Sequence, residues 1–423
     1  MSFELYCEAC GRPVAPTPYR PRCVACGGAL GFRYTEAAVR VERFLQGAPA
    51  RRMWDYGALL PVERPEAPVT LDEGGTALVR ASGGWGCRLW LKDETRNPTG
   101  SHKDRALSVA ITRGRELGFR SCVIVSAGST GLSTAAYAAR AGMRCALIAP
   151  RGTPDERLLP AALYGATLFE APGTFDDALR LVEAIAERHP LYLTSTARRS
   201  NPYQAEGTRT IGFEIAAQLA AAGERADWIV VPTGGGGTVA GIWRAYGELR
   251  QLGALPPGAA TDSGASGARL APLPRLATVQ PATYNALELA LARGLSTDEE
   301  LYALGISEET PTVQAKLQHG VPPDAGFALA ALRESGGTAT SVSDAAALAA
   351  QRRLASAEGS FAEPSAAAVL AGVERLVAEG TIKAHETVVA VVTGSGFREL
   401  GTLAGRVAVE RRALTAEALT SFL

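Results

Sequence analysis

The sequence predicts an α/β protein with two parallel sheets and a small cysteine-rich module at its N-terminus. From about residue 86 onward, short apolar runs alternate with helical patterns, as in parallel sheets covered on both faces by helices. Four of the seven cysteines lie near the N-terminus, in a segment rich in Pro and Gly. The length of 423 residues suggests two or three domains with sizeable cores.

Composition narrows the class of protein. The chain is 47% hydrophobic and 20% charged, which is ordinary for a soluble globular protein. Its formal net charge is zero, so it lacks the electrostatic footprint of a protein that binds nucleic acid or an anionic membrane. The first residues do not resemble a signal peptide, and no apolar run approaches bilayer length. We therefore expect a cytoplasmic protein without nucleic-acid or membrane partners.

The N-terminal module contains two C-x-x-C pairs separated by twelve residues. The four cysteines are Cys7, Cys10, Cys23 and Cys26. Paired thiolates at this spacing are typical of structural zinc sites, in which four protein ligands leave no open position for chemistry. The sequence predicts a zinc ribbon over residues 1–35, with reduced thiols that hold no metal as the alternative.

The alternating region begins with a predicted strand at 87–94 and a predicted helix at 102–117. The further predicted strands are 121–126, 144–150, 166–172, 191–196, 227–232, 275–281 and 386–394. The further predicted helices are 130–142, 155–165, 175–189 and 204–219. The stretch 253–274 is dense in Gly, Pro, Ala and Ser, which predicts a loop or linker.

Lys103 is the first candidate functional residue. The chain has 43 Lys plus Arg, of which only four are lysines, and Lys103 follows a turn containing Pro98 and Gly100. At a helix start, the positive end of the helix dipole disfavours the ammonium form. A lysine that loses its proton readily can attack an aldehyde and hold it as an imine. A solvated surface lysine is the alternative.

A run of four glycines follows the predicted strand at 227–232. They are Gly234, Gly235, Gly236 and Gly237, and Thr238 comes next. Successive N–H groups at a helix start form a concave anion site, to which the Thr238 hydroxyl can add a donor. The run is neither a Walker loop nor a GxGxxG dinucleotide motif. A flexible turn is the alternative, although ordering four glycines costs backbone entropy.

Two further strand ends carry hydroxyl side chains. Ser126, Ser129 and Thr130 lie where the predicted strand 121–126 passes into a helix, an arrangement that suits a carboxylate, or simply a helix cap. Thr393 closes the predicted strand 386–394, where ligands of open α/β sheets bind. Together the four stretches offer an amine, a phosphate cradle, a carboxylate site and a neutral hydroxyl, which complement pyridoxal phosphate carrying an amino acid.

On these stretches the chain resembles the fold-type-II (tryptophan synthase β-like) pyridoxal-phosphate enzymes, and among them the threonine synthase family. The matching segments are "LDEGGTALV" (71–79), "NPTGSHKDRA" (97–106), "SNPYQAEGTRTIGFEIAAQL" (200–219), "EGSFAEPSAAAVLAGV" (358–373) and "TGSGFREL" (393–400). The resemblance implies a large cofactor-binding domain over 36–104 and 198–423 and a small α/β domain over 105–197. It also fits the N-terminal zinc ribbon, which some relatives carry, and relatives are often homodimers.

The resemblance also implies roles for the candidate residues. Lys103 would hold the cofactor as a Schiff base, Gly234–Gly237 with Thr238 would bind its phosphate, and Thr393 would face the pyridine nitrogen. The family's Ser-x-Gly-Asn loop maps onto residues 126–129, so Ser129 stands where the family has the asparagine that contacts the ring hydroxyl.

A second departure concerns the substrate. Gln204 replaces the family's substrate-phosphate arginine, while Arg198 and Arg199 replace small polar residues. Either these two arginines bind the substrate's anionic group, or the substrate is not a phosphate ester.

The implied activity is that of a lyase converting O-phospho-L-homoserine and water to L-threonine and phosphate. In it, the Lys103 amine acts as the base at Cα, and Ser126, Ser129 and Thr130 bind the carboxylate. Two alternatives stay open. One is β-elimination or β-replacement on serine, threonine or O-phosphoserine, as in a dehydratase or a cysteate synthase. The other is a non-catalytic binding protein that retains the fold.

Overall fold

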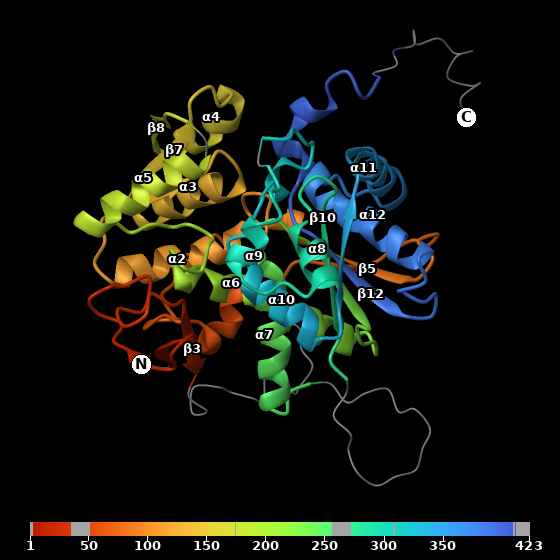
Figure 1. Cartoon of the computed structure of the whole chain (residues 1–423), viewed down its shortest axis with the longest axis horizontal. Helices are drawn as coiled ribbons and strands as arrows, with labels where there is room; N and C mark the ends of the chain where they lie inside the picture. The colour runs from red at the N-terminus through yellow and green to blue at the C-terminus, as the bar shows by residue number, and fades with distance from the viewer. Residues whose placement is uncertain are drawn as a thin grey trace.

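The computed structural model describes residues 3–34, 51–173, 175–255, 272–307, 309–408 and residue 411. Within these residues the chain forms three sheets, and a buried cluster of side chains packs against each of them (Figure 1). Most of the predicted linker 253–274 lies outside the described residues, as do residue 35 of the predicted zinc ribbon and 36–50 of the predicted large domain. Within the described part of the chain, no helix combines the length and the apolar character needed to cross a bilayer.

The N-terminal module is a three-stranded antiparallel sheet. Its strands are β1 (Phe3–Cys7), β2 (Pro13–Val14) and β3 (Leu30–Tyr34), in the order β2-β1-β3. Phe3 and Phe32 pack in one buried cluster with Trp54, Val109 and Tyr203, which lie far along the chain. The module is therefore docked on the rest of the molecule and shares its core.

The large sheet has six strands in the order β11-β10-β9-β12-β5-β4, all parallel except the edge pair β4 and β5. They are β4 (Leu78–Arg80), β5 (Arg88–Asp93), β9 (Trp228–Pro232), β10 (Arg275–Pro281), β11 (Thr338–Val342) and β12 (Thr387–Val392). Every residue of β9 and β12 is buried, which explains their unbroken apolar sequences.

Helices cover both faces of the large sheet. They are α6 (Pro202–Ala221), α7 (Gly237–Gln251), α8 (Ala286–Arg293), α9 (Asp298–Tyr302), α10 (Ala325–Glu334), α11 (Asp344–Glu358) and α12 (Pro364–Ala378). Alternate strand residues point to opposite faces, so Val231 packs with α6, α7 and α10 while Val230 packs with α11 and α12.

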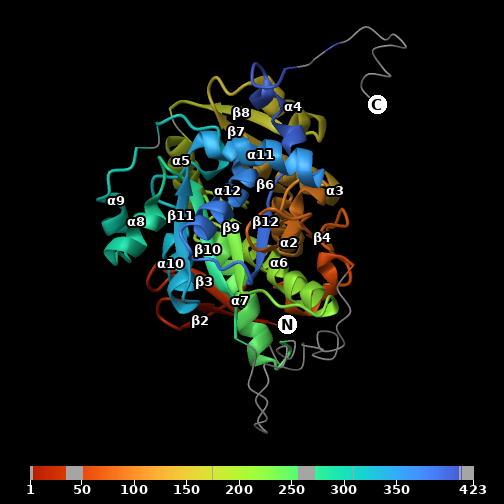
Figure 2. The ribbon, with the colours of Figure 1, turned by 90° about the vertical axis from the view of Figure 1, so that its right-hand side faces the viewer.

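The small sheet consists of the parallel strands β6 (Ser121–Val125), β7 (Arg144–Pro150) and β8 (Thr167–Ala171). Its helices are α2 (Lys103–Glu116), α3 (Ser129–Ala141), α4 (Asp155–Leu163) and α5 (Phe175–Arg188). Turned by 90°, the molecule shows β7 and β8 above the strands of the large sheet (Figure 2). Helix α2 packs against α3 on one side and α6 on the other, so it joins the small sheet to the large one.

Most predicted elements match, with differences of a few residues at their ends. The prediction of a strand at 191–196 is wrong, since only Leu193 forms a bridge, to Val123 of β6. Turns on both sides, from Leu191 N to His189 O and from Ala197 N to the Ser195 hydroxyl, draw the chain away from the sheet edge. Strand β11 was not predicted, because its sequence TATSV has no apolar run.

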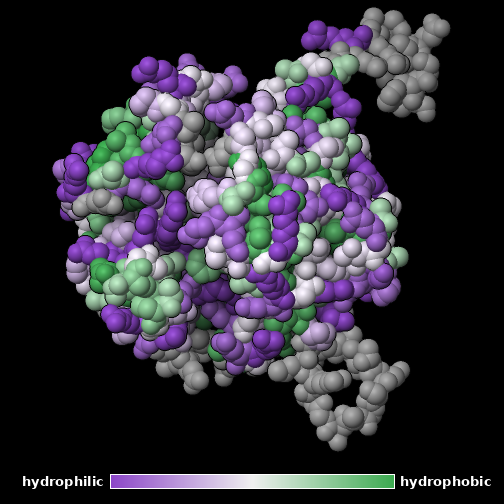
Figure 3. Space-filling model, viewed as in Figure 1, coloured by the Kyte–Doolittle hydropathy of each residue, from purple (hydrophilic) through white to green (hydrophobic). Residues whose placement is uncertain are grey.

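The surface is a mixture of polar and apolar patches (Figure 3). One apolar area covers the part of the molecule that contains α5 and β8, where Phe169, Leu181 and Ile185 are exposed.

Candidate active site

A single cavity of about 1270 Å³ collects residues from the carboxyl ends of β6, β9 and β12. It is lined by Lys103, by residues 126–130, by Gly234–Thr238 and by Thr393. All four stretches that the sequence marked as chemistry-bearing therefore meet in one place, at the edge of the parallel sheets where ligands of open α/β folds bind.

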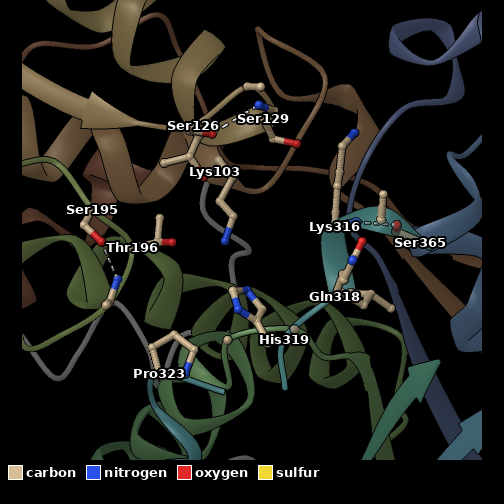
Figure 4. A pocket seen from close by; sticks show the side chains of 18 of the residues that line it. Lys103, Ser126, Ser129, Ser195, Thr196, Lys316, Gln318, His319, Pro323 and Ser365 are labelled. Atoms are coloured by element: carbon tan, nitrogen blue, oxygen red, sulfur yellow. Dashed lines mark hydrogen bonds between the residues drawn. The ribbon is translucent and has the colours of Figure 1, made fainter. Parts of the chain in front are cut away.

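Lys103 begins α2 and its side chain points into the cavity (Figure 4). Burial lowers the pKa of its amine to about 8, although the carboxylates of Asp324 and Glu363 oppose this shift. A sizeable fraction of an amine with this pKa is unprotonated near neutral pH, which is what a nucleophilic or basic lysine needs.

The turn before Lys103 is fastened to the end of β12. Gly100 has a φ of 81°, a left-handed conformation that favours glycine. Its carbonyl accepts a hydrogen bond from Ser395 N at 2.8 Å, and His102 N donates to Thr393 O at 3.0 Å. These bonds hold Lys103 and Thr393 in one site although almost 300 residues separate them in the chain.

Asp104 secures the same turn from the other side. Its buried carboxylate accepts hydrogen bonds from Thr99 N at 2.7 Å, from the Thr99 hydroxyl at 2.6 Å and from the Ser133 hydroxyl of α3 at 2.5 Å. Burial raises the pKa of Asp104 to about 6, while these donors act in the opposite direction. The start of α2 is thus tied to α3 as well as to β12.

A fully buried ionic cluster anchors the first turn of α2. Arg105 Nε donates to Glu94 at 2.7 Å, and its Nη1 and Nη2 donate to Glu214 of α6 at 2.6 and 2.7 Å. Lys92 of β5 donates to Glu214 at 2.7 Å. Burial alone would raise the pKa of Glu214, but Arg105 and Lys92 hold it at about 2. This cluster was not predicted from the sequence. Charged residues inside otherwise apolar segments were the signal that could have indicated it.

The glycine run forms an open backbone cradle at the start of α7. Among the described residues, no acceptor is bound by the N–H groups of Gly234–Thr238. A Cβ atom at Gly234 would lie 2.8 Å from Lys316 O, and one at Gly236, where φ is 93°, would lie 2.9 Å from Asp324 O. Side chains therefore do not fit here, and the unused donors at a positive helix end suit an anion such as a phosphate.

The predicted carboxylate loop lies beside Lys103 (Figure 4). Ser126 and Ser129 flank the turn into α3, and the Ser126 hydroxyl accepts a hydrogen bond from Gly128 N at 3.1 Å. Ser126, Ser129 and Thr130 all line the cavity. Thr393, only 6% exposed, lines it from the end of β12.

The structure contradicts the prediction that Arg198 contacts the substrate. Its guanidinium donates to both carboxylate oxygens of Glu8 at 2.7 and 2.8 Å and lies over the Phe327 ring, and Arg198 is not among the residues that line the cavity. The cause is tertiary, because the N-terminal module supplies the partner. Arg199 and Gln204 do line the cavity, and no ion pair among the described residues uses the Arg199 guanidinium.

Several charged cavity residues were not predicted. Lys316 pairs with Glu363 and with Glu399, the latter at 3.0 Å. Arg398 lines the cavity, and its Nε and Nη1 atoms are buried without an acceptor among the described residues. Arg157 also lines it. Lys316 and Arg157 lie outside the segments that resemble the family, whereas Glu363, Arg398 and Glu399 lie inside them but were given no role, and only the fold brings these charges to the site.

The four N-terminal cysteines form a second cluster. Their sulfur atoms all lie within 4.8 Å of one another, with Cys7 and Cys26 at 3.5 Å and Cys10 and Cys23 at 3.8 Å. Four thiols converging in this way fit the donor set of a structural zinc ion.

The cavity combines a lysine amine that can bind an aldehyde with a backbone cradle that can bind a phosphate, and it lies between two parallel sheets. This combination defines a class of protein, the pyridoxal-phosphate-dependent enzymes of the α/β type. The sequence profile of the family described as "Pyridoxal-phosphate dependent enzyme" matches residues 69–394. The threonine synthase of Methanosarcina acetivorans is 36% identical over 95% of this chain and 93% of its own length. That of Methanocaldococcus jannaschii is 32% identical over 93% of this chain and 92% of its own length. This chain belongs to the threonine synthase family.

Solved structures agree at the level of the fold. An O-ureido-L-serine synthase covers 82% of this chain and 96% of its own, with a TM-score of 0.62 and 22% identity. A threonine deaminase from Solanum lycopersicum covers 79% of this chain and 88% of its own, with a TM-score of 0.61 and 20% identity. The predictions of a fold-type-II α/β protein and of a pyridoxal-phosphate-dependent lyase of the threonine synthase type are confirmed.

Proposed function

We propose that the enzyme converts O-phospho-L-homoserine and water to L-threonine and phosphate. The observation that carries this proposal is that Arg199 lines the cavity of Lys103 with its guanidinium unpaired by any described residue. The cavity thus offers a cationic fork in addition to the glycine cradle that the cofactor's own phosphate would occupy. A substrate with a carboxylate at one end and a phosphate at the other matches this arrangement of charge.

The residues present fit pyridoxal phosphate. Lys103 would hold it covalently, the N–H groups of Gly234–Gly237 and the Thr238 hydroxyl would bind its phosphate, and Thr393 would face the ring nitrogen. Ser129 would lie near the ring hydroxyl, with a shorter reach than the family's asparagine. When bound, the cofactor supplies a conjugated ring that stabilises negative charge at the substrate's Cα.

Lys103 is the proposed base of the reaction. With the cofactor bound, its amine would remove the proton from the substrate's Cα. For the conversion to balance, a proton also leaves Cβ, the γ-phosphate departs with its bonding electrons, water adds its oxygen at Cβ, and protons are returned to Cα and Cγ. The hydroxyls of Ser126, Ser129 and Thr130, at the positive end of α3, hold the substrate carboxylate so that the Cα proton faces this amine. A neutral Thr393 leaves the ring nitrogen without a formal counter-charge.

Arg199 and Gln204 are proposed to bind the phosphate that leaves. The guanidinium neutralises the charge that develops on the leaving oxygen, and the Gln204 amide donates to Thr196 O at 2.8 Å, which fixes its orientation in the wall. Arg157 and Arg398 supply further positive charge to the same cavity.

We also propose that the four N-terminal cysteines bind a structural zinc ion. All four protein ligands are thiols, so the ion would keep no open position and would take no part in the reaction.

Product analysis tests the proposed reaction. The purified holoenzyme is incubated with O-phospho-L-homoserine, and threonine and phosphate are quantified. We expect both in equal amounts, and Arg199→Met should lower kcat/KM by roughly 10²-fold through loss of a charge-assisted bidentate contact. The matched control, Arg250→Met, removes an exposed arginine outside this cavity. No threonine from this substrate would overturn the proposal.

A second candidate is β-elimination or β-replacement on serine, threonine or O-phosphoserine. It is favoured by Gln204, which stands at the cavity where the family has an arginine. Pyruvate, 2-oxobutyrate or a β-substituted alanine formed from these substrates, with no threonine from O-phospho-L-homoserine, would support it.

A further inference from the structure

The N-terminal module reaches the loop that carries Arg199. Glu8, which lies between the paired cysteines Cys7 and Cys10, binds the Arg198 guanidinium with both carboxylate oxygens, at 2.7 and 2.8 Å. Arg22 Nε donates to Arg199 O at 3.1 Å, and the Tyr19 hydroxyl donates to Ser200 O at 3.3 Å. Three consecutive loop residues are therefore each held by a residue of the module.

The same loop is linked to the glycine run through hydrogen bonds of Asp324. Arg198 N donates to Asp324 Oδ1 at 3.1 Å, and Asp324 N donates to Gly235 O at 2.8 Å. The other carboxylate oxygen of Asp324 lies 2.8 Å from where a Cβ of Gly237 would stand. An unbroken chain of contacts thus runs from Glu8 through Arg198 and Asp324 to the glycine run.

Glu8 is the main partner of Arg198. Arg198 is 4% exposed, and its other carboxylate, Glu206, is 3.9 Å away and already pairs with Arg209 at 3.1 Å and with Arg244. Removing the Glu8 charge would leave a buried guanidinium without the carboxylate to which its Nη1 donates, a change that buried ion pairs tolerate poorly. The loop would then lose one of the three module contacts that hold residues 198–200.

We propose that Glu8 and Arg198 are positioning residues for the active site. In this proposal the four-cysteine module holds the loop at 197–201 in a fixed position relative to the glycine run. Glu8 sits inside the first cysteine pair, so its position depends on an intact cysteine cluster. The module therefore acts on cofactor affinity and on the placement of Arg199. Only the effect on Arg199 rests on the proposed substrate.

The test compares Glu8→Gln with Glu4→Gln, which makes the same change at an exposed residue of the same module. Hydrogen exchange of the full chain is followed in peptides covering 195–204, and pyridoxal phosphate is titrated into the cofactor-free protein by fluorescence. For Glu8→Gln we expect faster exchange in 195–204 with unchanged exchange in β9 and β12. We also expect roughly three- to tenfold weaker cofactor binding, and Glu4→Gln should match the wild type.

Two further variants separate positioning from general stability. Arg198→Lys keeps the charge but loses the planar guanidinium that lies over the Phe327 ring, and Cys10→Ser breaks the cluster, so both should reproduce the local exchange increase. In kinetics, Glu8→Gln should raise KM for the phosphorylated substrate more than it lowers kcat, and Glu8→Asp should restore part of the loss.

Unchanged exchange in 195–204, or faster exchange confined to β1–β3 with wild-type cofactor affinity, would overturn the proposal. Neither the exchange nor the titration depends on the substrate, so a failure of the proposed reaction would be seen separately.

Discussion

At the scale of single residues, the site depends on how one lysine is placed. Lys103 is one of four lysines in the chain, and burial at the start of α2 lowers the pKa of its amine to about 8. The other partners proposed for the cofactor are backbone N–H groups and neutral hydroxyls, which would bind it but not react. Substituting Lys103 should therefore remove the chemistry and leave the cavity intact.

Lys103→Ala should abolish the visible absorbance band of lysine-bound cofactor, because the other lysine of the cavity, Lys316, is held in ion pairs with Glu363 and Glu399. The control is Lys383→Ala, an exposed lysine whose amine donates only to Gly380 O. Spectra of both purified proteins with added pyridoxal phosphate provide the measurement. A variant at position 103 that kept the wild-type band would contradict the role given to this lysine.

The lowered pKa of Lys103 predicts how cofactor capture depends on pH. Only the unprotonated amine attacks an aldehyde, so below the pKa of about 8 the capture rate should rise about tenfold per pH unit, and above it the rate should level off. Stopped-flow mixing of cofactor-free protein with pyridoxal phosphate between pH 6 and 10 measures this. A rate that keeps rising to pH 10 would indicate a lysine with an ordinary pKa.

At the scale of elements, helix α2 is the part that connects the two sheets. It carries Lys103 and Asp104 at its start, and Arg105 binds Glu94 and Glu214 beneath the site. Taking these charges out of water is costly unless each is paired. The cluster therefore ties α2, α6 and the segment after β5 into one arrangement, and so sets the direction of Lys103.

Glu214→Gln should destabilise the protein by roughly 3–5 kcal/mol, because Arg105 and Lys92 would lose a buried partner. Glu379→Gln is the matched control: its ion pair with Arg375 is about half exposed, so we expect a loss of no more than about 1 kcal/mol. Urea unfolding followed by circular dichroism gives both values. Equal stabilities of the two variants would argue against the anchoring role of the cluster.

At the scale of the whole molecule, the two parallel sheets carry the cavity, and the N-terminal sheet supports a loop beside it. The N-terminal module shares a core with Trp54 and Tyr203 and contacts the loop beside the cavity. The domain boundaries at 104/105 and 197/198, and the homodimer, stay predictions. The small sheet lies within residues 121–171, inside the predicted small domain.

The purified protein should carry one zinc ion per chain, and Cys23→Ser should lose it, since three thiols bind far more weakly than four. Cys87→Ser, which changes a cysteine outside the cluster, should retain the metal. Metal analysis by mass spectrometry of both variants checks this. A metal-free wild-type protein prepared without chelators would contradict the zinc proposal.

The sequence alone determined much of this protein because several of its signals are local. A run of four glycines, a lysine after a tight turn and paired cysteines are short patterns whose chemistry shows without a fold. The unbroken apolar runs of β9 and β12 likewise predicted strands buried on both faces.

Only the tertiary structure decided which charges meet. Arg198 and Arg199 are adjacent and chemically equal in the sequence, yet Arg198 pairs with Glu8 while Arg199 lines the cavity. The same holds for Arg105 with Glu214 and for Lys316 with Glu363. The physical reason is that an ion pair depends on distance in space and on burial, and both arise when segments far apart in the chain pack together.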